Sequence, residues 1–139
     1  MPLVEVIIPS SNGLEHVEQC LPTLEKQILI DFHTTVVDNG SSDGTAEWLQ
    51  THDPAIRIIR NTWNRGFAQA VNQAIRNSGT KYIATLNNDT KVDREWLCHL
   101  VEVAESNQSI GMVASKMLFA DRPTIINSAG ICVDRAGIA

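Results

Sequence analysis

Two aspartates, Asp38 and Asp89, stand where apolar segments of the chain end. Asp38 directly follows Val36-Val37, and Asp89 follows Leu86 and two asparagines. A carboxylate held beside amides can accept a hydrogen bond from a nucleobase or a ribose, or it can bind a divalent cation. Mg²⁺ and Mn²⁺ prefer oxygen ligands and commonly bind through one or two carboxylates together with substrate phosphates. Both aspartates are therefore candidates for a nucleotide and metal site, the alternative being that each only begins a turn.

Short apolar runs alternate with amphipathic stretches along most of the chain. The apolar runs predict strands over residues 3–8, 32–37, 56–60, 82–86 and 110–115. Apolar residues at helical spacing predict helices over residues 14–24, 45–51 and 67–77, and a further helix with Asp93 as its N-cap. Pro22 lies inside the first of these helices, which is therefore predicted to be kinked or made of two pieces. Beyond Pro123 the pattern weakens, and residues 125–126 and 131–133 are candidates for short strands.

This alternation predicts an α/β fold, with a mostly parallel sheet flanked by helices on both faces. In such sheets, ligands bind beyond the carboxyl ends of the strands. Four polar clusters follow predicted strands, at residues 9–12, 38–43, 61–66 and 87–89. We therefore expect these clusters to gather at one edge of the sheet and to form the binding site.

Composition limits the classes of protein to which the chain can belong. With 139 residues and 43% hydrophobic content it is long and apolar enough for one folded domain. A formal net charge of -5 argues against binding nucleic acid by phosphate neutralisation. No apolar stretch approaches the roughly 18 residues that a membrane span needs. The first basic residue is Lys26, so no secretory signal is expected, and the unpatterned Cys20, Cys98 and Cys132 are expected to be reduced thiols in the cytoplasm.

Other polar residues near the predicted strand ends have weaker signals. The segment 41–45 could hold a phosphate at a helix N-terminus, but it lacks the P-loop lysine, and helix capping by Asp43 is favoured. Arg65 is a candidate for contact with a base or phosphate, and a solvated arginine is equally consistent with the sequence. The four histidines have no metal-ligand spacing and are expected at the surface.

Three segments occur in an order that is specific to one family: residues 36–45 (VVDNGSSDGT), 64–68 (NRGFA) and 86–89 (LNND). Together they resemble family 2 glycosyltransferases, particularly the rhamnosyltransferase-like branch, over Val4 to about Gly130. The resemblance implies the GT-A fold and an enzyme that takes a sugar from a nucleoside diphosphate and inverts its anomeric carbon. It also implies a place in polysaccharide biosynthesis and a cytoplasmic location, with the inner face of the membrane as a place of action.

The resemblance assigns roles to particular residues of this chain. Nucleotide binding falls to Pro9, Ser10, Asp38, Asn64, Arg65, Gly66 and Asn88. Among these, Asp38 resembles the aspartate that bonds a uracil or thymine ring. Asn87-Asn88-Asp89 takes the place of the DxD motif, with Asp89 as the ligand of Mg²⁺ or Mn²⁺. The implied partners are a UDP- or dTDP-linked sugar and a carbohydrate or lipid-linked acceptor.

The chain departs from the family pattern at three points. Ser11 stands where an aromatic residue is common, and Asn87 replaces the first acid of the DxD motif. The third departure is the end of the chain at Ala139, because the family's general base is expected beyond that residue. Residues 1–139 are thus expected to be the donor-binding part of a GT-A domain that is incomplete at its C-terminus. Such a part could expose apolar surface and self-associate as a homo-oligomer.

Three alternatives remain open at this point. The chain could be a nucleotide-sugar-binding module without catalytic activity of its own. An oxidoreductase domain of the dinucleotide-binding type is disfavoured, because residues 9–13 after the first strand lack the glycine fingerprint. A nucleotidyltransferase of similar fold is disfavoured because the first loop is neither basic nor glycine-rich.

Overall fold

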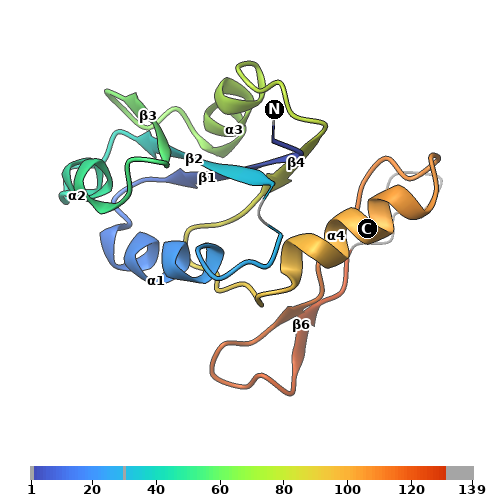
Figure 1. Ribbon diagram of the computed structural model, residues 1–139. Coiled ribbons are helices and arrows are strands. Elements are labelled where there is room, and N and C mark those ends of the chain that lie inside the picture. The colour runs from blue at the N-terminus through green and yellow to red at the C-terminus, as the bar shows by residue number, and fades with distance from the viewer. Residues whose placement is uncertain (1, 30, 131–139) are drawn as a thin grey trace, which may run out of the picture. The chain divides into compact units, whose positions relative to one another are not determined.

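The computed structural model of the chain describes residues 2–29 and 31–130 (Figure 1). These residues form two compact units, Met1–Glu95 and Trp96–Ala139, and each is described by itself. The first unit contains all of the predicted site residues. The second contains one helix and a two-stranded antiparallel sheet.

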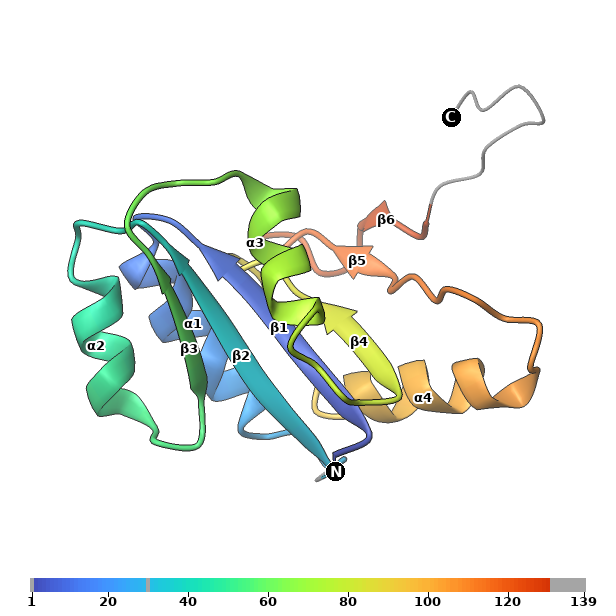
Figure 2. The ribbon, with the colours of Figure 1, turned by 90° about the horizontal axis from the view of Figure 1, so that it is seen from above.

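The first unit is built on a four-stranded sheet in the order β3-β2-β1-β4, in which every pair of neighbours is parallel. The strands are β1 (Val4–Ser10), β2 (Phe32–Asn39), β3 (Arg57–Asn61) and β4 (Tyr82–Thr85). Three helices connect them: α1 (Leu14–Leu24), α2 (Thr45–His52) and α3 (Phe67–Ile75). Helices α1 and α2 cover one face of the sheet and α3 covers the other (Figure 2). The predicted α/β architecture is therefore confirmed.

The core lies on both faces of the two central strands. Val6, Ile7 and Ile8 of β1 are fully buried, as are Val36 and Val37 of β2. This explains why both strands are near-continuous apolar runs instead of alternating patterns, since helices cover both faces. On the α3 side, Ile7 and Val37 pack in one cluster with the small residues Ala70 and Ala74.

Strand β1 is longer than predicted and continues through Pro9 to Ser10. The prediction ended this strand before Pro9 because proline cannot donate a ladder hydrogen bond. Pairing with β4 ends at Ile7–Thr85, whereas pairing with β2 continues to Ser10–Asp38. Along β1, the Leu3 and Ile7 carbonyls accept from the β4 side, so the nitrogen of Pro9 faces that side, beyond the last pair. The proline therefore disrupts no pairing.

Strand β2 is also longer than predicted, and this changes the setting of the site. The prediction placed Asp38 and Asn39 in a loop, but both are strand residues that pair with Arg60 and Asn61 of β3. Both are buried, with 0% and 4% of their surface exposed. The reason is that pairing with β3 provides backbone partners that the local sequence does not reveal.

Two helices and one strand differ from the prediction in their extent. Helix α1 runs as one piece through Pro22, which lies in its last turn, so it is not made of two pieces. Helix α4 (Trp96–Ser106) begins three residues after Asp93, whose side chain accepts a hydrogen bond from the Glu95 N–H at 2.9 Å just before the helix. The predicted strand over residues 110–115 is absent, because this apolar run has no partner strand among the described residues.

The second unit instead pairs β5 (Met117–Leu118) with β6 (Ile126–Ser128). This confirms a short strand near residues 125–126. The candidate strand over residues 131–133 lies outside the described residues. Within the part of the chain that the structure describes, no helix has the length and apolar character that crossing a bilayer requires.

Candidate functional site

The loops at the carboxyl ends of the parallel strands contact one another, as predicted. Asn12, after β1, bridges to the loop after β2: its N–H donates to Ser41 Oγ at 2.9 Å and its Oδ1 accepts from the Ser42 N–H at 2.8 Å. Asn64, after β3, donates to Ser11 Oγ at 3.1 Å. These bonds tie three loops into one polar edge.

The turn after β4 joins the same edge through Asn88. Its Nδ2 donates to the Oγ of Ser10 at 2.9 Å. The approach depends on Gly13, because a Cβ at that position would lie 2.3 Å from Asn88 Nδ2. Two predicted nucleotide-binding residues, Ser10 and Asn88, are thus in direct contact.

Asp38 is the most distinctive side chain of this edge. It is fully buried, and its Oδ1 accepts a hydrogen bond from the Ser41 N–H at 3.1 Å. Its Oδ2 is buried without any hydrogen-bond partner. The nearest cation is the guanidinium of Arg60, whose Nε lies 3.7 Å from Oδ2. A buried carboxylate oxygen without a donor is costly, and such groups are uncommon in folded proteins.

A network of asparagines holds the loop between β3 and α3 in place. The Asn39 Oδ1 accepts from the Asn61 side chain at 3.1 Å and from the Arg65 N–H at 3.0 Å. The Asn39 Nδ2 donates to the Asn64 Oδ1 at 2.8 Å, and this oxygen also accepts from the Gly66 N–H. The amide of Asn64 is therefore engaged within the chain, and it positions the loop.

Arg65 is exposed but is not an isolated solvated side chain. Its guanidinium lies 5.4 Å from the ring centroid of Trp63, a cation–π contact. The backbone of Trp63 packs against Gly40, where φ is +77° and a Cβ would lie 2.6 Å from the Trp63 Cα. Only glycine fits at position 40, two residues beyond Asp38. The backbone of Trp63, which carries the exposed Trp63–Arg65 pair, therefore packs directly against this position.

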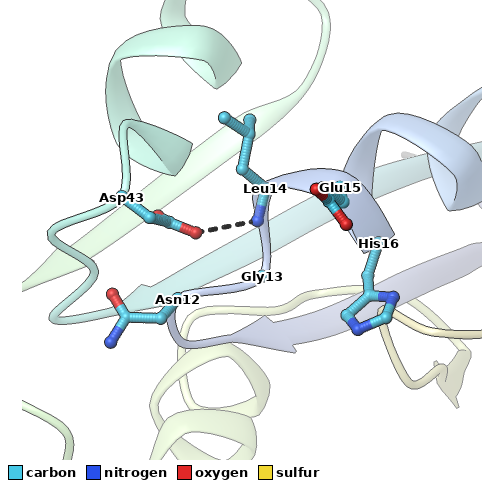
Figure 3. A pocket seen from close by; sticks show the side chains of 6 residues that line it. All are labelled: Asn12, Gly13, Leu14, Glu15, His16 and Asp43. Atoms are coloured by element: carbon cyan, nitrogen blue, oxygen red, sulfur yellow. Dashed lines mark hydrogen bonds between the residues drawn. The ribbon is translucent and has the colours of Figure 1, made fainter.

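Asp43 confirms the capping role favoured by the sequence. Its Oδ2 accepts from the Leu14 N–H at 3.0 Å, at the start of α1, and its Oδ1 accepts from the Thr45 N–H at 3.1 Å, at the start of α2. Figure 3 shows this carboxylate pointing at the Leu14 nitrogen beside a cavity of about 300 Å³ that is also lined by His16. The Thr45 hydroxyl and the two N–H groups hold the pKa of Asp43 below its usual range.

The segment 41–45 is not an open phosphate cradle. The N–H groups of Ser41, Ser42 and Thr45 donate to side chains of the chain itself, namely those of Asp38, Asn12 and Asp43. These donors are therefore already in use.

Asp89 is exposed in the turn after β4. The turn packs on α1, where the Cys20 Sγ lies 3.8 Å from the Asn87 carbonyl oxygen. Burial raises the pKa of the Cys20 thiol to about 11, and the nearby charge of Asp89 adds to this. Asp38 and Asp89 do not stand on adjacent strands, because β1 lies between β2 and β4.

The comparisons with known proteins decide the family. The family model "Glycosyl transferase family 2" matches residues 5–128. The chain belongs to glycosyltransferase family 2. It is 32% identical over 111 residues to the uncharacterized glycosyltransferase EpsJ of Bacillus subtilis, covering 78% of this chain and 32% of EpsJ. It is also 27% identical over 117 residues to an uncharacterized glycosyltransferase of Haemophilus influenzae, covering 82% of this chain and 36% of that protein. The chain therefore spans about a third of the length of these curated relatives.

Solved structures confirm the GT-A type of this family 2 chain. The mannosyltransferase PcManGT of Pyrobaculum calidifontis, solved with GDP-Man and Mn²⁺, matches with a TM-score of 0.68 and 28% identity, over 81% of this chain and 34% of that one. TarS of S. aureus, solved with UDP-GlcNAc, matches with a TM-score of 0.70 over 78% of this chain and 32% of that one. At 20% identity, the TarS match shows the fold alone.

The metal-binding capacity of this family 2 chain rests on few groups. Within residues 2–29 and 31–130, no three His, Cys, Asp or Glu side chains gather where they could hold a metal ion. The turn after β4 offers the Asp89 carboxylate and the neighbouring amide oxygens. This all-oxygen set fits Mg²⁺ or Mn²⁺ when a diphosphate supplies further ligands.

Sequence reasoning missed several residues of this edge. Arg60 was not among the candidates, and Asn39 and Asn61 were expected only as members of the polar clusters 38–43 and 61–66, although all three contact candidate residues or their loops. An asparagine at the end of each of two neighbouring strands was a usable signal. The role of Arg60 required the strand register.

Proposed function

We propose that this chain carries the donor-binding part of a glycosyltransferase that transfers a sugar from a UDP- or dTDP-linked donor to an acceptor hydroxyl. The observation that carries the proposal is the Oδ2 of Asp38, which is buried without a hydrogen-bond partner at the edge where four loops converge. Family membership supports a nucleotide-sugar ligand for this edge.

Asp38 has the chemistry to bind the base. The ring N–H of uracil or thymine is a donor that matches a carboxylate oxygen without a partner. Pro9 and Ser10, at the end of β1, would border this base. The backbone of residues 64–66 and the side chains of Arg65 and Asn88 would border the ribose and the diphosphate.

Asp89 would hold Mg²⁺ or Mn²⁺ together with the diphosphate. When bound, the cation neutralises the negative charge that develops on the leaving diphosphate. The Mn²⁺ complex of PcManGT supports a metal at this site. Two bonds from Thr90 to the Asn87 carbonyl, at 3.3 and 2.6 Å, hold the backbone of the turn that carries Asp89.

The proposal extends to parts of the reaction that lie outside this edge. Inversion at the anomeric carbon, a rhamnosyltransferase-like donor and a carbohydrate or lipid-linked acceptor are its finer statements, and they rest on the family resemblance carried by residues 36–45, 64–68 and 86–89. The chain spans about a third of the length of its curated relatives, so the reaction of the whole protein is part of the proposal. Exposed Met112 and Ile126 support self-association.

One alternative is favoured by the same length comparison. This chain could bind a nucleotide sugar and catalyse nothing by itself. A positioned base commonly contributes about 10²- to 10⁴-fold to such a reaction. Donor binding with little hydrolysis or transfer would support the alternative for the isolated chain.

Calorimetric titration tests the proposal. UDP and dTDP are titrated with and without Mn²⁺ into the wild type, Asp38→Ala and Asp89→Ala, with Asp121→Ala, a carboxylate of the second unit, as the matched control. We expect Asp38→Ala to weaken binding in both metal conditions and Asp89→Ala to remove the gain from Mn²⁺, about tenfold for one lost charged contact. Binding of NAD(H) with no response to either diphosphate would instead favour an oxidoreductase.

A further inference from the structure

Arg60 and Glu47 form a pair beside Asp38 to which no role has been given so far. Arg60 on β3 is the cross-strand neighbour of Asp38 on β2, so both side chains lie on the same face of the sheet. The Arg60 Nη2 donates to the Oε1 of Glu47 at 2.8 Å, and Glu47 lies in the first turn of α2. Its Nε lies 3.7 Å from Asp38 Oδ2, which is too long for a hydrogen bond.

The guanidinium is thus shared unequally between two carboxylates. Its hydrogen bond goes to Glu47, whose side chain is 64% exposed, and Asp38, which is fully buried, receives only the charge. A buried carboxylate without a nearby cation would be unfavourable. If Arg60 instead bonded directly to Oδ2, a ligand would have to displace it. The observed arrangement avoids both outcomes.

We propose that Arg60, oriented by Glu47, is a positioning residue that balances the charge of Asp38 while leaving the buried Oδ2 without a hydrogen bond, so that a nucleobase N–H entering this edge can supply one. This inference rests on the proposed function and deepens it. It makes the Glu47–Arg60 pair a determinant of base selectivity, although neither residue needs to contact the nucleotide.

The choice of base follows from hydrogen-bond chemistry. Uracil presents a ring N–H where cytosine presents a bare nitrogen, which can only accept. A carboxylate oxygen that lacks a donor attracts the uracil N–H and repels the bare nitrogen of cytosine. UDP and CDP carry the same ribose and diphosphate, so their affinity ratio reports on the base contact alone.

The test compares UDP and CDP binding by calorimetry in the full 139-residue chain. Variants are Arg60→Gln, which removes the charge, Arg60→Lys, which keeps it, and Glu47→Ala, which releases the guanidinium. Arg57→Gln is the matched control, since Arg57 lies on the same strand and donates to the Asn77 carbonyl. Thermal unfolding shows that each variant is folded.

We expect Arg60→Gln to weaken UDP binding about tenfold and to leave CDP binding unchanged, as for loss of a charge-assisted contact. Arg60→Lys should retain most of the affinity. Glu47→Ala should weaken UDP binding by letting Arg60 occupy Oδ2, and should add nothing in the Arg60→Gln background. Arg57→Gln should behave as wild type.

Equal losses for UDP and CDP in Arg60→Gln would overturn the inference and indicate a phosphate contact. Unchanged UDP affinity would also overturn it. If the wild type binds neither UDP nor dTDP, the proposed function itself fails, and the two failures are thereby distinguished.

Discussion

The sheet has a buried carboxylate at each end, and the two differ in what surrounds them. Glu5 lies near the amino end of β1 and Asp38 near the carboxyl end of β2, and both are fully buried. Each has one oxygen without a hydrogen bond. The Glu5 Oε1, however, accepts from the Thr35 hydroxyl at 2.6 Å, and His33 Nε2 lies 3.4 Å from Oε2. His33, expected at the surface, is thus partly buried against Glu5.

The surroundings of Glu5 are protein side chains that stabilise its charge. Burial alone would raise the pKa of Glu5, but hydrogen bonds from Ser78 and Thr35, with the nearby His33, outweigh it and lower the pKa below its ordinary value. Asp38 has one backbone donor and a guanidinium that Glu47 holds away. Burial of a carboxylate therefore does not mark a binding site. An oxygen without a hydrogen bond does not mark a binding site by itself either, since Glu5 also has one. Asp38 differs from Glu5 in having fewer protein donors and in lying at the carboxyl edge of the sheet.

The largest expected effect is on nucleotide affinity, which should depend on Asp38 and not on Glu5. Asp38→Asn exchanges an acceptor for an amide, and the loss of a hydrogen bond to a charged group should weaken UDP binding about 10- to 100-fold. Glu5→Gln, at the other end of the sheet, should leave UDP affinity unchanged. Calorimetry on both variants measures this. Similar losses in the two variants would show that the comparison reflects folding and not recognition.

The sequence was sufficient to predict the parallel sheet and the edge where ligands would bind. Alternating apolar runs and helical stripes carry that information locally. Asp38 and Asp89 could be chosen as candidate site residues because each comes after such a run. Asp38 was nevertheless placed in a loop, because its strand continues through pairing with β1 and β3, which the local sequence does not reveal. Residues 110–115 show the reverse case, an apolar run without a partner strand.

Contacts that depend on register could not be predicted from one sequence. Arg60 lies opposite Asp38 only because β2 and β3 pair as Thr35–Arg57 through Asn39–Asn61, and a shift by one residue would turn Arg60 to the other face. The asparagine network has the same origin, since Asn39 and Asn61 meet at the last pair. Local propensity predicts loops for such residues and does not reveal their partners.

A smaller effect is expected on the free energy of unfolding, to which the ionised Glu5 should contribute. Its folded pKa lies below the usual 4.5, so its contribution to folding is present above that pH and is lost as the pH falls through the folded pKa. Glu5→Gln should reduce the free energy of unfolding by about 1–2 kcal/mol at pH 7. The difference from wild type should shrink in strongly acidic solution. Urea unfolding across this range measures it, with the exposed Glu18→Gln as control, and a pH-independent difference would contradict the assigned ionisation.

The smallest effect concerns Asp43, which lies at the same edge as Asp38 but resembles Glu5 in its surroundings. Both of its oxygens accept from the chain, at the starts of α1 and α2. Asp43→Ala should therefore cost about 1 kcal/mol of unfolding free energy, as for a lost cap, and should change UDP affinity far less than Asp38→Asn. Because its pKa is lowered from 3.8, this contribution should persist at neutral pH and disappear only as the pH falls below that value. If Asp43→Ala instead weakened UDP binding as strongly as Asp38→Asn, position at the carboxyl edge, and not an unpartnered oxygen, would be what defines the site.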